Sequence, residues 1–185
     1  LNLDGEMHLG LRKEHMPFFK AGHVDELRKK VSLKVTELLD AIAPKGECNL
    51  VHEVSQQLPI FTLSEILGIP ESDRQKLIEW MEFLELAQYF TLEQIKQNEE
   101  GITDTTPDPA LVEMFNNMID EMFDYGRFIL DEKKSKPQND LLSAIANAKI
   151  EGEDLSQEFL DGSWLLIIFA GNDTTRNTMS GGIKL

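Results

Sequence analysis

The sequence predicts an all-α, mainly helical fold with about six to seven helices, and three observations lead to this prediction. Apolar residues recur three and four positions apart through almost every segment, which is the period of a helix with one buried face. Most proline and glycine residues fall between these segments. No segment alternates apolar and polar residues, so no strand of any length is expected.

The first half of the chain predicts four helices. A row of apolar residues at helical spacing covers 24–39. A brief helix follows that Pro59 is expected to interrupt, because proline removes a donor and clashes with the preceding turn. The next helix covers 61–67, and Pro70 then opens another at the first-turn position that proline tolerates.

The second half predicts three more helices after a polar connection. Residues 97–109 are polar and turn-rich and are interpreted as a flexible connection. The last two of them, aspartate and then proline, predict the start of a long helix that ends near Lys134. A short helix is expected over 140–148, and Ser156 can cap a final helix rich in Leu, Ile and Phe.

Length and ends indicate one partial domain. The 185 residues suffice for one domain with a core, and residues 1–185 are interpreted as a single domain truncated at both ends. Residue 1 is leucine, and the last four residues stop without a tail. The longest apolar run, 164–170, is far shorter than the roughly 20 residues of a spanning helix, so no membrane partner is expected.

Charge and cysteine content indicate which partners and which cellular compartment to expect. The formal net charge is −15, which repels phosphate backbones and makes nucleic acid an unexpected partner. Residues 1–36 hold seven basic and five acidic residues, which indicates either a docking site for an acidic partner or a solvated helix face. Cys48 is the only cysteine, so a reducing, cytoplasmic location is expected, and its thiol is interpreted as buried.

Residues 170–175, with the sequence AGNDTT, are where chemistry is expected. They follow an apolar helical run, yet Gly, Asn, Asp and two Thr cost a helix roughly 3–4 kcal/mol relative to alanine. Such a local conflict is typical of a functional site. The alternative, that the helix stops at Gly171 and Asp173 or Thr174 caps another, is equally consistent with the spacing.

The spacing favours a functional helix face. Leu166, Ala170 and Thr174 lie four apart on one face. Much of this face is small, so a flat ligand can lie against the backbone. A threonine hydroxyl inside a helix can also bond to the carbonyl four residues earlier.

Four segments in order resemble the cytochrome P-450 family of haem-thiolate monooxygenases. Residues 170–175 are similar to the signature of its long central helix. Residues 8–12 (HLGLR) resemble its propionate-binding helix. Residues 63–70 (LSEILGIP) resemble a segment of the bacterial members, and residues 139–143 (NDLLS) resemble the segment that precedes the central helix. The resemblance implies an internal fragment of the P-450 fold, of the bacterial type.

The resemblance implies an activity and a cofactor. Members of the family insert one oxygen atom of O2 into an apolar small molecule, using haem and electrons from a redox partner, here expected to be of the ferredoxin type. By resemblance, Asp173 relays protons and Thr174 hydrogen-bonds the oxygen reduced at the haem. Ala170 and Gly171 match the small positions that leave room for that oxygen.

Other residues take roles by the same resemblance. His8 and Arg12 match the residues that bind the haem propionates, a task suited to charge-assisted donors. Leu166, Phe169 and Ala170 are expected to border the substrate. The segment 83–90 and the polar loop after it match the lid over the pocket, although aromatic residues packed in a core are an equal alternative for any one of them.

The departures from the family also lead to predictions. Cys48 lacks the Gly-rich context of the family's thiolate, so the axial cysteine is expected outside this chain, and the chain alone is expected to be inactive. Two other readings stay open. One is a non-enzymatic acidic helical interaction domain, and the other places residues 171–175 at a helix N-terminus as an anion site.

Overall fold

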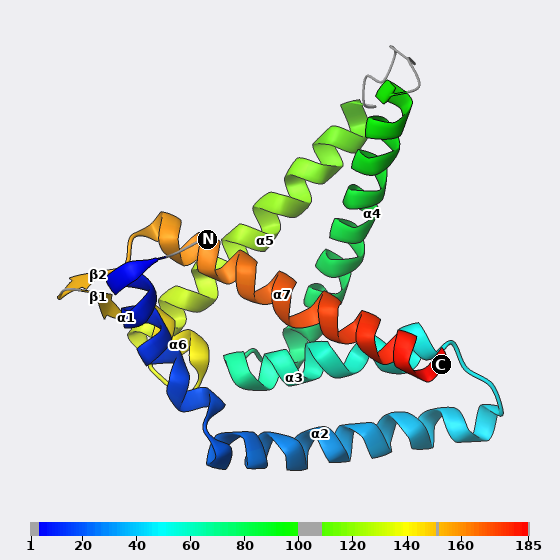
Figure 1. Ribbon diagram of the computed structural model, residues 1–185, viewed down its shortest axis with the longest axis horizontal. Helices are drawn as coiled ribbons and strands as arrows, with labels where there is room; N and C mark the ends of the chain where they lie inside the picture. Colours follow the sequence, from blue (N-terminus) through cyan, green and yellow to red (C-terminus); the bar gives the residue numbers. More distant parts are fainter. Residues whose placement is uncertain (1–3, 100–108, 151, 185) are drawn as a thin grey trace.

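The computed structural model describes residues 4–99, 109–150 and 152–184 (Figure 1). Within these residues it contains seven α-helices, four short helical turns and one hairpin, so the predicted all-α class is confirmed. The elements are α1 Gly5–His15, η1 Met16–Phe19, α2 Ala21–Ile42, η2 Ala43–Lys45, η3 Val51–Ser55, α3 Gln57–Leu67, η4 Glu71–Asp73, α4 Arg74–Glu99, α5 Pro109–Ser135, α6 Leu141–Ala146, β1 Lys149–Ile150, β2 Glu153–Asp154 and α7 Gln157–Lys184.

Caps set two of the helix boundaries as the sequence predicts. Ser156 accepts a hydrogen bond from the Phe159 amide at 3.2 Å and so caps α7. Asp140 accepts from the Ser143 amide at 2.8 Å at the start of α6. The aspartate expected to start α5 lies outside the described residues, as does most of the predicted polar connection.

Three sequence predictions are wrong in detail. Pro59 does not interrupt a helix, because it lies in the first turn of α3, where its missing N–H would have no helical partner. The strands β1 and β2 form a small antiparallel hairpin, too short to show alternation, in which Lys149 pairs with Asp154. Cys48 is exposed, since it lies in the loop between η2 and η3 among other exposed residues.

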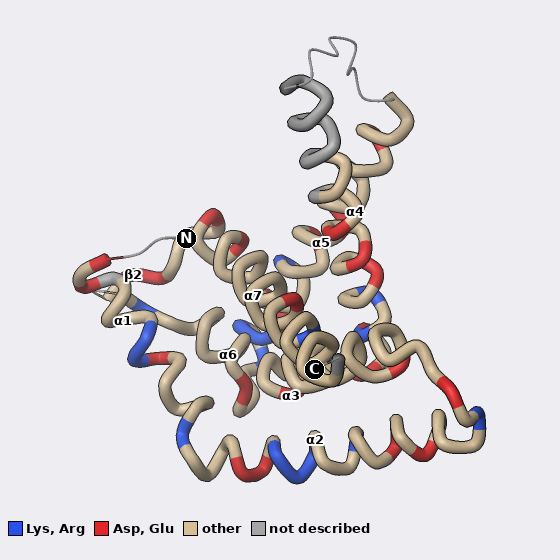
Figure 2. Tube along the Cα trace, turned by 45° about the vertical axis from the view of Figure 1, so that its right-hand side comes forward, with Lys and Arg blue, Asp and Glu red and all other residues tan. Residues whose placement is uncertain are grey.

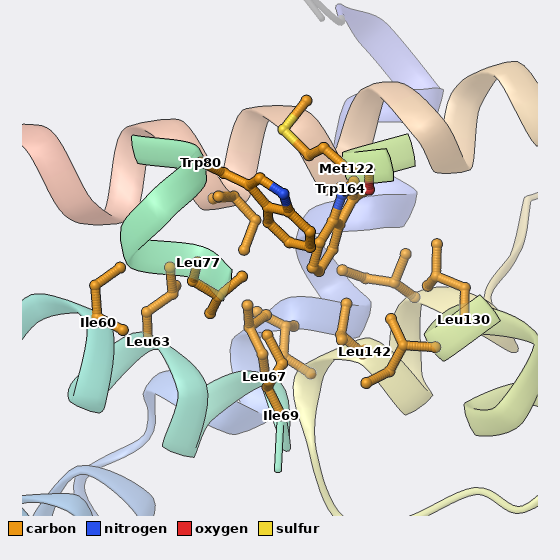
Figure 3. Packing of buried hydrophobic residues seen from close by; sticks show 14 of the residues in the cluster. Ile60, Leu63, Leu67, Ile69, Leu77, Trp80, Met122, Leu130, Leu142 and Trp164 are labelled. Carbon is orange, nitrogen blue, oxygen red and sulfur yellow. Dashed lines mark hydrogen bonds between the residues drawn. The ribbon is translucent and has the colours of Figure 1, made fainter. Parts of the chain in front are cut away.

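The core lies where α3, α4, α5, α6 and α7 meet (Figure 3). Trp80 of α4 and Trp164 of α7 are each 1% exposed and stack edge to face, with ring centroids 6.5 Å apart. The Trp164 Nε1–H donates to the backbone carbonyl of Met122 in α5 at 3.1 Å. This bond satisfies the polar atom of a buried indole and fixes α5 against α7.

A buried ion pair joins the end of α5 to the start of α6, beside the end of α3. Lys133 and Asp140 are almost fully buried, and their Nζ and Oδ2 atoms lie 2.5 Å apart. Gly68 ends α3 with a φ of +70°, and a Cβ at this position would lie 2.2 Å from the Asp140 carboxylate. The glycine is therefore required both for the left-handed turn and for the close approach of the ion pair.

The peripheral helices are arranged around this core (Figure 1). α4 and α5 project together from the body as an arm, and α2 runs along the opposite side. α1 packs against α6 and β1. In the described part of the chain, no helix combines the length and the apolar character needed to cross a membrane.

Candidate active site

The sequence AGNDTT lies in the middle of an unbroken helix. α7 runs from Gln157 to Lys184, so the alternative that a helix stops at Gly171 is wrong. The anion-site reading is also wrong, because no helix begins in this stretch. Residues with low helix propensity are therefore held in a helix by packing around them.

The two sides of α7 differ sharply in burial. One row at a spacing of four residues is buried against the body and consists of Trp164, Ile168, Asn172 and Arg176. The row that the sequence singles out, Leu166, Ala170 and Thr174, is exposed among the described residues. A helix central to the fold thus presents an uncovered face of mostly small side chains.

The Thr174 hydroxyl lies on this exposed face. It donates to the Ala170 carbonyl at 3.1 Å, which is the back-bond expected from the sequence. The Thr178 hydroxyl donates in the same way to the Thr174 carbonyl at 2.8 Å. The lone pairs of the Thr174 hydroxyl oxygen remain available to accept from a donor above this face.

The Asp173 carboxylate is held on one side by its own helix. Its Oδ1 atom accepts from Asn177 at 2.9 Å and from Arg176 at 3.1 Å. The Asp173 side chain is 52% exposed, whereas the Arg176 side chain is only 10% exposed. Arg176 also forms an ion pair with Glu85 of α4. The acid next to Thr174 therefore belongs to an ion-pair network that reaches a second helix.

A cavity of about 670 Å³ adjoins α7 on its α3 side. α7 contributes to its wall Ile167, Ala170, Gly171, Thr175 and Met179. The wall is completed by residues of α1, η1, α2, α3 and α6, most of them apolar. Ala170 and Gly171 thus line a cavity as predicted, whereas the described geometry places Leu166, Asp173 and Thr174 outside its wall.

His8 and Arg12 lie one turn apart on α1, and both are exposed. Neither has a hydrogen-bond or ion-pair partner among the described residues. The end of the same helix reaches the cavity through His15. Burial lowers the pKa of His15 below its ordinary value, while neighbouring Glu14 opposes this shift.

The comparisons with known proteins agree on one family. A cytochrome P450 of Bacillus subtilis is 31% identical over 97% of this chain and 40% of that relative. A steroid C26-monooxygenase of Mycolicibacterium smegmatis is 24% identical over 100% of this chain and 42% of that relative. A solved structure of a Mycobacterium marinum cytochrome P450 in complex with pseudoionone has a TM-score of 0.76 at 25% identity, over 96% of this chain and 40% of that one.

Over nearly its whole length the chain is similar to bacterial cytochromes P450. No protein-family model matches the sequence. The chain spans less than half the length of the curated P450 relatives it matches, between 35% and 45% in the cases compared. Similarity to cytochromes P450 implies haem as the cofactor.

Two parts of the predicted P450 substrate site have a structural role in this chain. Phe169 is partly buried and packs against the core. In the segment 83–90, Phe83 packs against Phe115 of α5 with ring centroids 5.2 Å apart. The same segment then turns outward, since Tyr89 and Phe90 are 60% and 47% exposed. The core interpretation is therefore confirmed for Phe83, and the lid interpretation stays a prediction.

Sequence reasoning missed two features of the P450 site. Thr175 and Met179 line the cavity, although only the row through Thr174 was singled out. Arg176 was not assigned a role, although it follows Asp173 by three residues, the spacing of neighbours on a helix. The sequence spacing could have found the contact between Arg176 and Asp173, but not the contact with Glu85, which is 91 positions away in the sequence.

Proposed function

We propose that the whole protein is a haem-dependent monooxygenase that inserts one oxygen atom of O2 into an apolar organic substrate. Similarity to cytochromes P450 and to a steroid monooxygenase supports this reaction class. The steroid C26-monooxygenase name and the pseudoionone complex of two related proteins favour an apolar substrate. The observation that carries the proposal is the exposed, small-residue face of α7, with the Thr174 hydroxyl and the Asp173 carboxylate beside each other on it.

The residues of this face fit haem. When bound, haem supplies an iron whose thiolate ligand favours cleavage of the O–O bond. Ala170 and Gly171 have little or no side chain, so a flat macrocycle and a small oxygen species can approach the helix there. Leu166, on the same exposed row, offers an apolar contact at its edge.

Asp173 and Thr174 are proposed to supply protons. Half of the Asp173 side chain is exposed, so its carboxylate can exchange protons with solvent. While the Thr174 hydroxyl donates its proton to the Ala170 carbonyl, its oxygen keeps free lone pairs. It can therefore accept a hydrogen bond from a protonated group above the exposed face and hold that group in place. Protonation is thereby directed to one oxygen atom, which couples electron use to product formation.

His8 and Arg12 are proposed to hold the haem propionates. Both are donors on one exposed face of α1 without partners among the described residues. A guanidinium fork suits a carboxylate better than a point charge does. The end of the same helix reaches the cavity that Ala170 and Gly171 line, which supports a haem site between α1 and α7.

The axial thiolate is proposed to come from a cysteine outside this chain. Cys48 is exposed in a loop, and it is not among the residues that line the cavity beside Ala170 and Gly171. The chain spans less than half the length of its relatives, which leaves room for a thiolate segment elsewhere in the whole protein. By itself this chain is expected to be inactive.

Two variants of the whole protein test the proton relay. Thr174→Ala should still bind haem, substrate and O2, because a smaller side chain fits the same helix, but it should release hydrogen peroxide in place of product. Asp173→Asn keeps the shape but loses the acid, so turnover should slow by roughly 10²-fold. The measurement is reductant consumed, peroxide formed and product formed. Normal turnover with tight coupling in Thr174→Ala would refute the role of this hydroxyl.

A spectrum separates the monooxygenase from an acidic helical interaction domain. The whole protein, reduced under carbon monoxide, should show the shifted absorbance band of a haem-thiolate protein. A protein that binds no haem and shows no band would instead favour the interaction domain, for which the net charge of −15 is the main support.

A further inference from the structure

Asn172 carries a buried amide on the side of α7 that faces the body of the molecule. The residue is 1% exposed, and it follows Trp164 and Ile168 in the buried row of this helix. Within residues 4–99, 109–150 and 152–184, neither its Oδ1 nor its Nδ2 atom has a hydrogen-bond partner. Buried polar groups of folded proteins are almost always hydrogen-bonded, so this amide requires partners that the described side chains do not supply.

The guanidinium of Arg176 has an unpartnered donor one turn further along the same row. Arg176 follows Asn172 by four residues, which makes the two side chains neighbours on the helix surface. Its Nη1 and Nη2 atoms form the ion pairs with Glu85 and Asp173. Its buried Nε–H has no acceptor in the part of the chain that the structure describes. An unpartnered donor therefore lies next to the unpartnered amide.

The hydroxyl of Ser55 lies at the same junction. Ser55 is fully buried and is the last residue of η3, which packs against α7. The next residue, Gln56, donates to Glu82 of α4 at 2.8 Å. Glu82 lies one turn before Glu85, with which Arg176 pairs. The Ser55 Oγ atom also has no partner among the described residues. A hydroxyl, an amide and a guanidinium N–H thus surround the place where η3, α4 and α7 meet.

We propose that Asn172, Arg176 and Ser55 form an internal binding site for ordered water, on the side of α7 away from Thr174. The chemistry of these groups identifies the ligand. The amide needs both a donor for its oxygen and an acceptor for its nitrogen, and the guanidinium N–H needs an acceptor. A water molecule donates and accepts, whereas a metal ion or an anion satisfies only one of these two needs. Buried water binds in this way to polar groups that otherwise lack partners.

The water site accounts for an asparagine in a row that is otherwise suited to packing. Leucine is similar in size to asparagine and would fill position 172 without burying an amide. With asparagine there, water can join α7 to η3 by hydrogen bonds where side chains do not reach one another. The inference concerns the buried side of α7 and does not depend on the proposed monooxygenase reaction.

The first test is a high-resolution crystal structure of the unmodified full-length haem protein. It should show a water oxygen that bridges Arg176 Nε and a polar atom of the Asn172 side chain, at about 2.7–3.2 Å from each. An amide that bonds directly to protein groups, or a junction with no water that bridges the two residues, overturns the inference. This test needs no variant, so it decides the question even if substitutions at these positions prevent folding.

The second test counts internal water in solution by oxygen-17 relaxation dispersion, which detects water molecules that stay bound for longer than the protein takes to tumble. The reduced carbon monoxide form of the full-length protein is diamagnetic and suits this measurement. Asn172→Leu should lower the number of long-lived water molecules by at least one, because leucine offers no hydrogen bond. Asn116→Leu makes the same exchange at an exposed position of α5 and should leave the number unchanged. An unchanged number in Asn172→Leu, or an equal fall in Asn116→Leu, overturns the inference.

Discussion

At the scale of the residue, His15 has an environment that makes stability depend on pH. It lines the cavity, and its Nε2 atom is buried without a hydrogen-bond partner among the described residues. Burial lowers the pKa of His15 in the folded state, so the neutral imidazole ring is favoured there. The contribution of His15 to stability is therefore full above the ordinary histidine pKa of about 6.5, and it is lost as the pH falls below that value.

His15→Gln is expected to weaken this dependence. Glutamine keeps a polar side chain but does not titrate, so the drop in the unfolding temperature between pH 8 and pH 5.5 should be smaller than in the wild type. Thermal unfolding of both proteins at the two pH values is the measurement. Equal drops in the two proteins would show that His15 is not buried as described.

At the scale of the element, the approach of α5 to α7 depends on Gly126. An added Cβ at this position would lie 2.5 Å from Cδ1 of the Trp164 ring, closer than packing allows. The ring cannot easily retreat, because it stacks on Trp80 and Tyr125 and its Nε1–H is bonded to Met122. The absence of a side chain at residue 126 is therefore a packing requirement.

Gly126→Ala is expected to destabilise the protein by about 1–2 kcal/mol. The gain in helix propensity of about 1 kcal/mol is outweighed by overpacking, which costs about 1–3 kcal/mol and more against a fixed ring. Denaturant unfolding measures the difference. Gly22→Ala in α2, where no atom lies within 4 Å of the added Cβ, is the control and should be neutral or stabilising.

At the scale of the whole molecule, charge is distributed unevenly over the surface. Figure 2 shows basic residues on α1 and α2. Those of α2 are paired locally or with α3: Lys29 with Glu26, and Lys30 with Glu65. Lys13 of α1 is exposed and has no ion-pair partner among the described residues. Of the basic residues on α1 and α2, those of α1 are therefore available to an acidic partner, and they lie beside the proposed haem site.

Electron transfer from an acidic, ferredoxin-type partner is expected to slow with salt. Exposed charges are screened within about 8 Å at physiological ionic strength. Lys13→Glu should lower the rate and flatten its salt dependence, whereas Lys29→Glu, the same charge change at a locally paired site, should do so less. Stopped-flow reduction at several salt concentrations measures this. A rate insensitive to both salt and Lys13→Glu would place the docking surface elsewhere.

Much of this fold follows from local sequence. Helical period, the caps at Asp140 and Ser156 and the left-handed turn at Gly68 each involve residues within a few positions of one another, so they can be read without the tertiary structure. The row of Leu166, Ala170 and Thr174 is local in the same sense. The hairpin was missed because two residues per strand carry no detectable pattern.

The sequence by itself determined most of the helices, the AGNDTT stretch and its back-bonded threonine, because these depend on spacing along one helix. Only the tertiary structure decided which residues each side of that helix contacts. Gly171 has a packing role against Leu63, whose Cδ1 would lie 2.9 Å from an added Cβ, as well as a place in the cavity wall. Glu85 reaches Arg176 across 91 positions, and Cys48 is exposed where burial was expected. Such contacts depend on which helices fold together, and no local spacing encodes them.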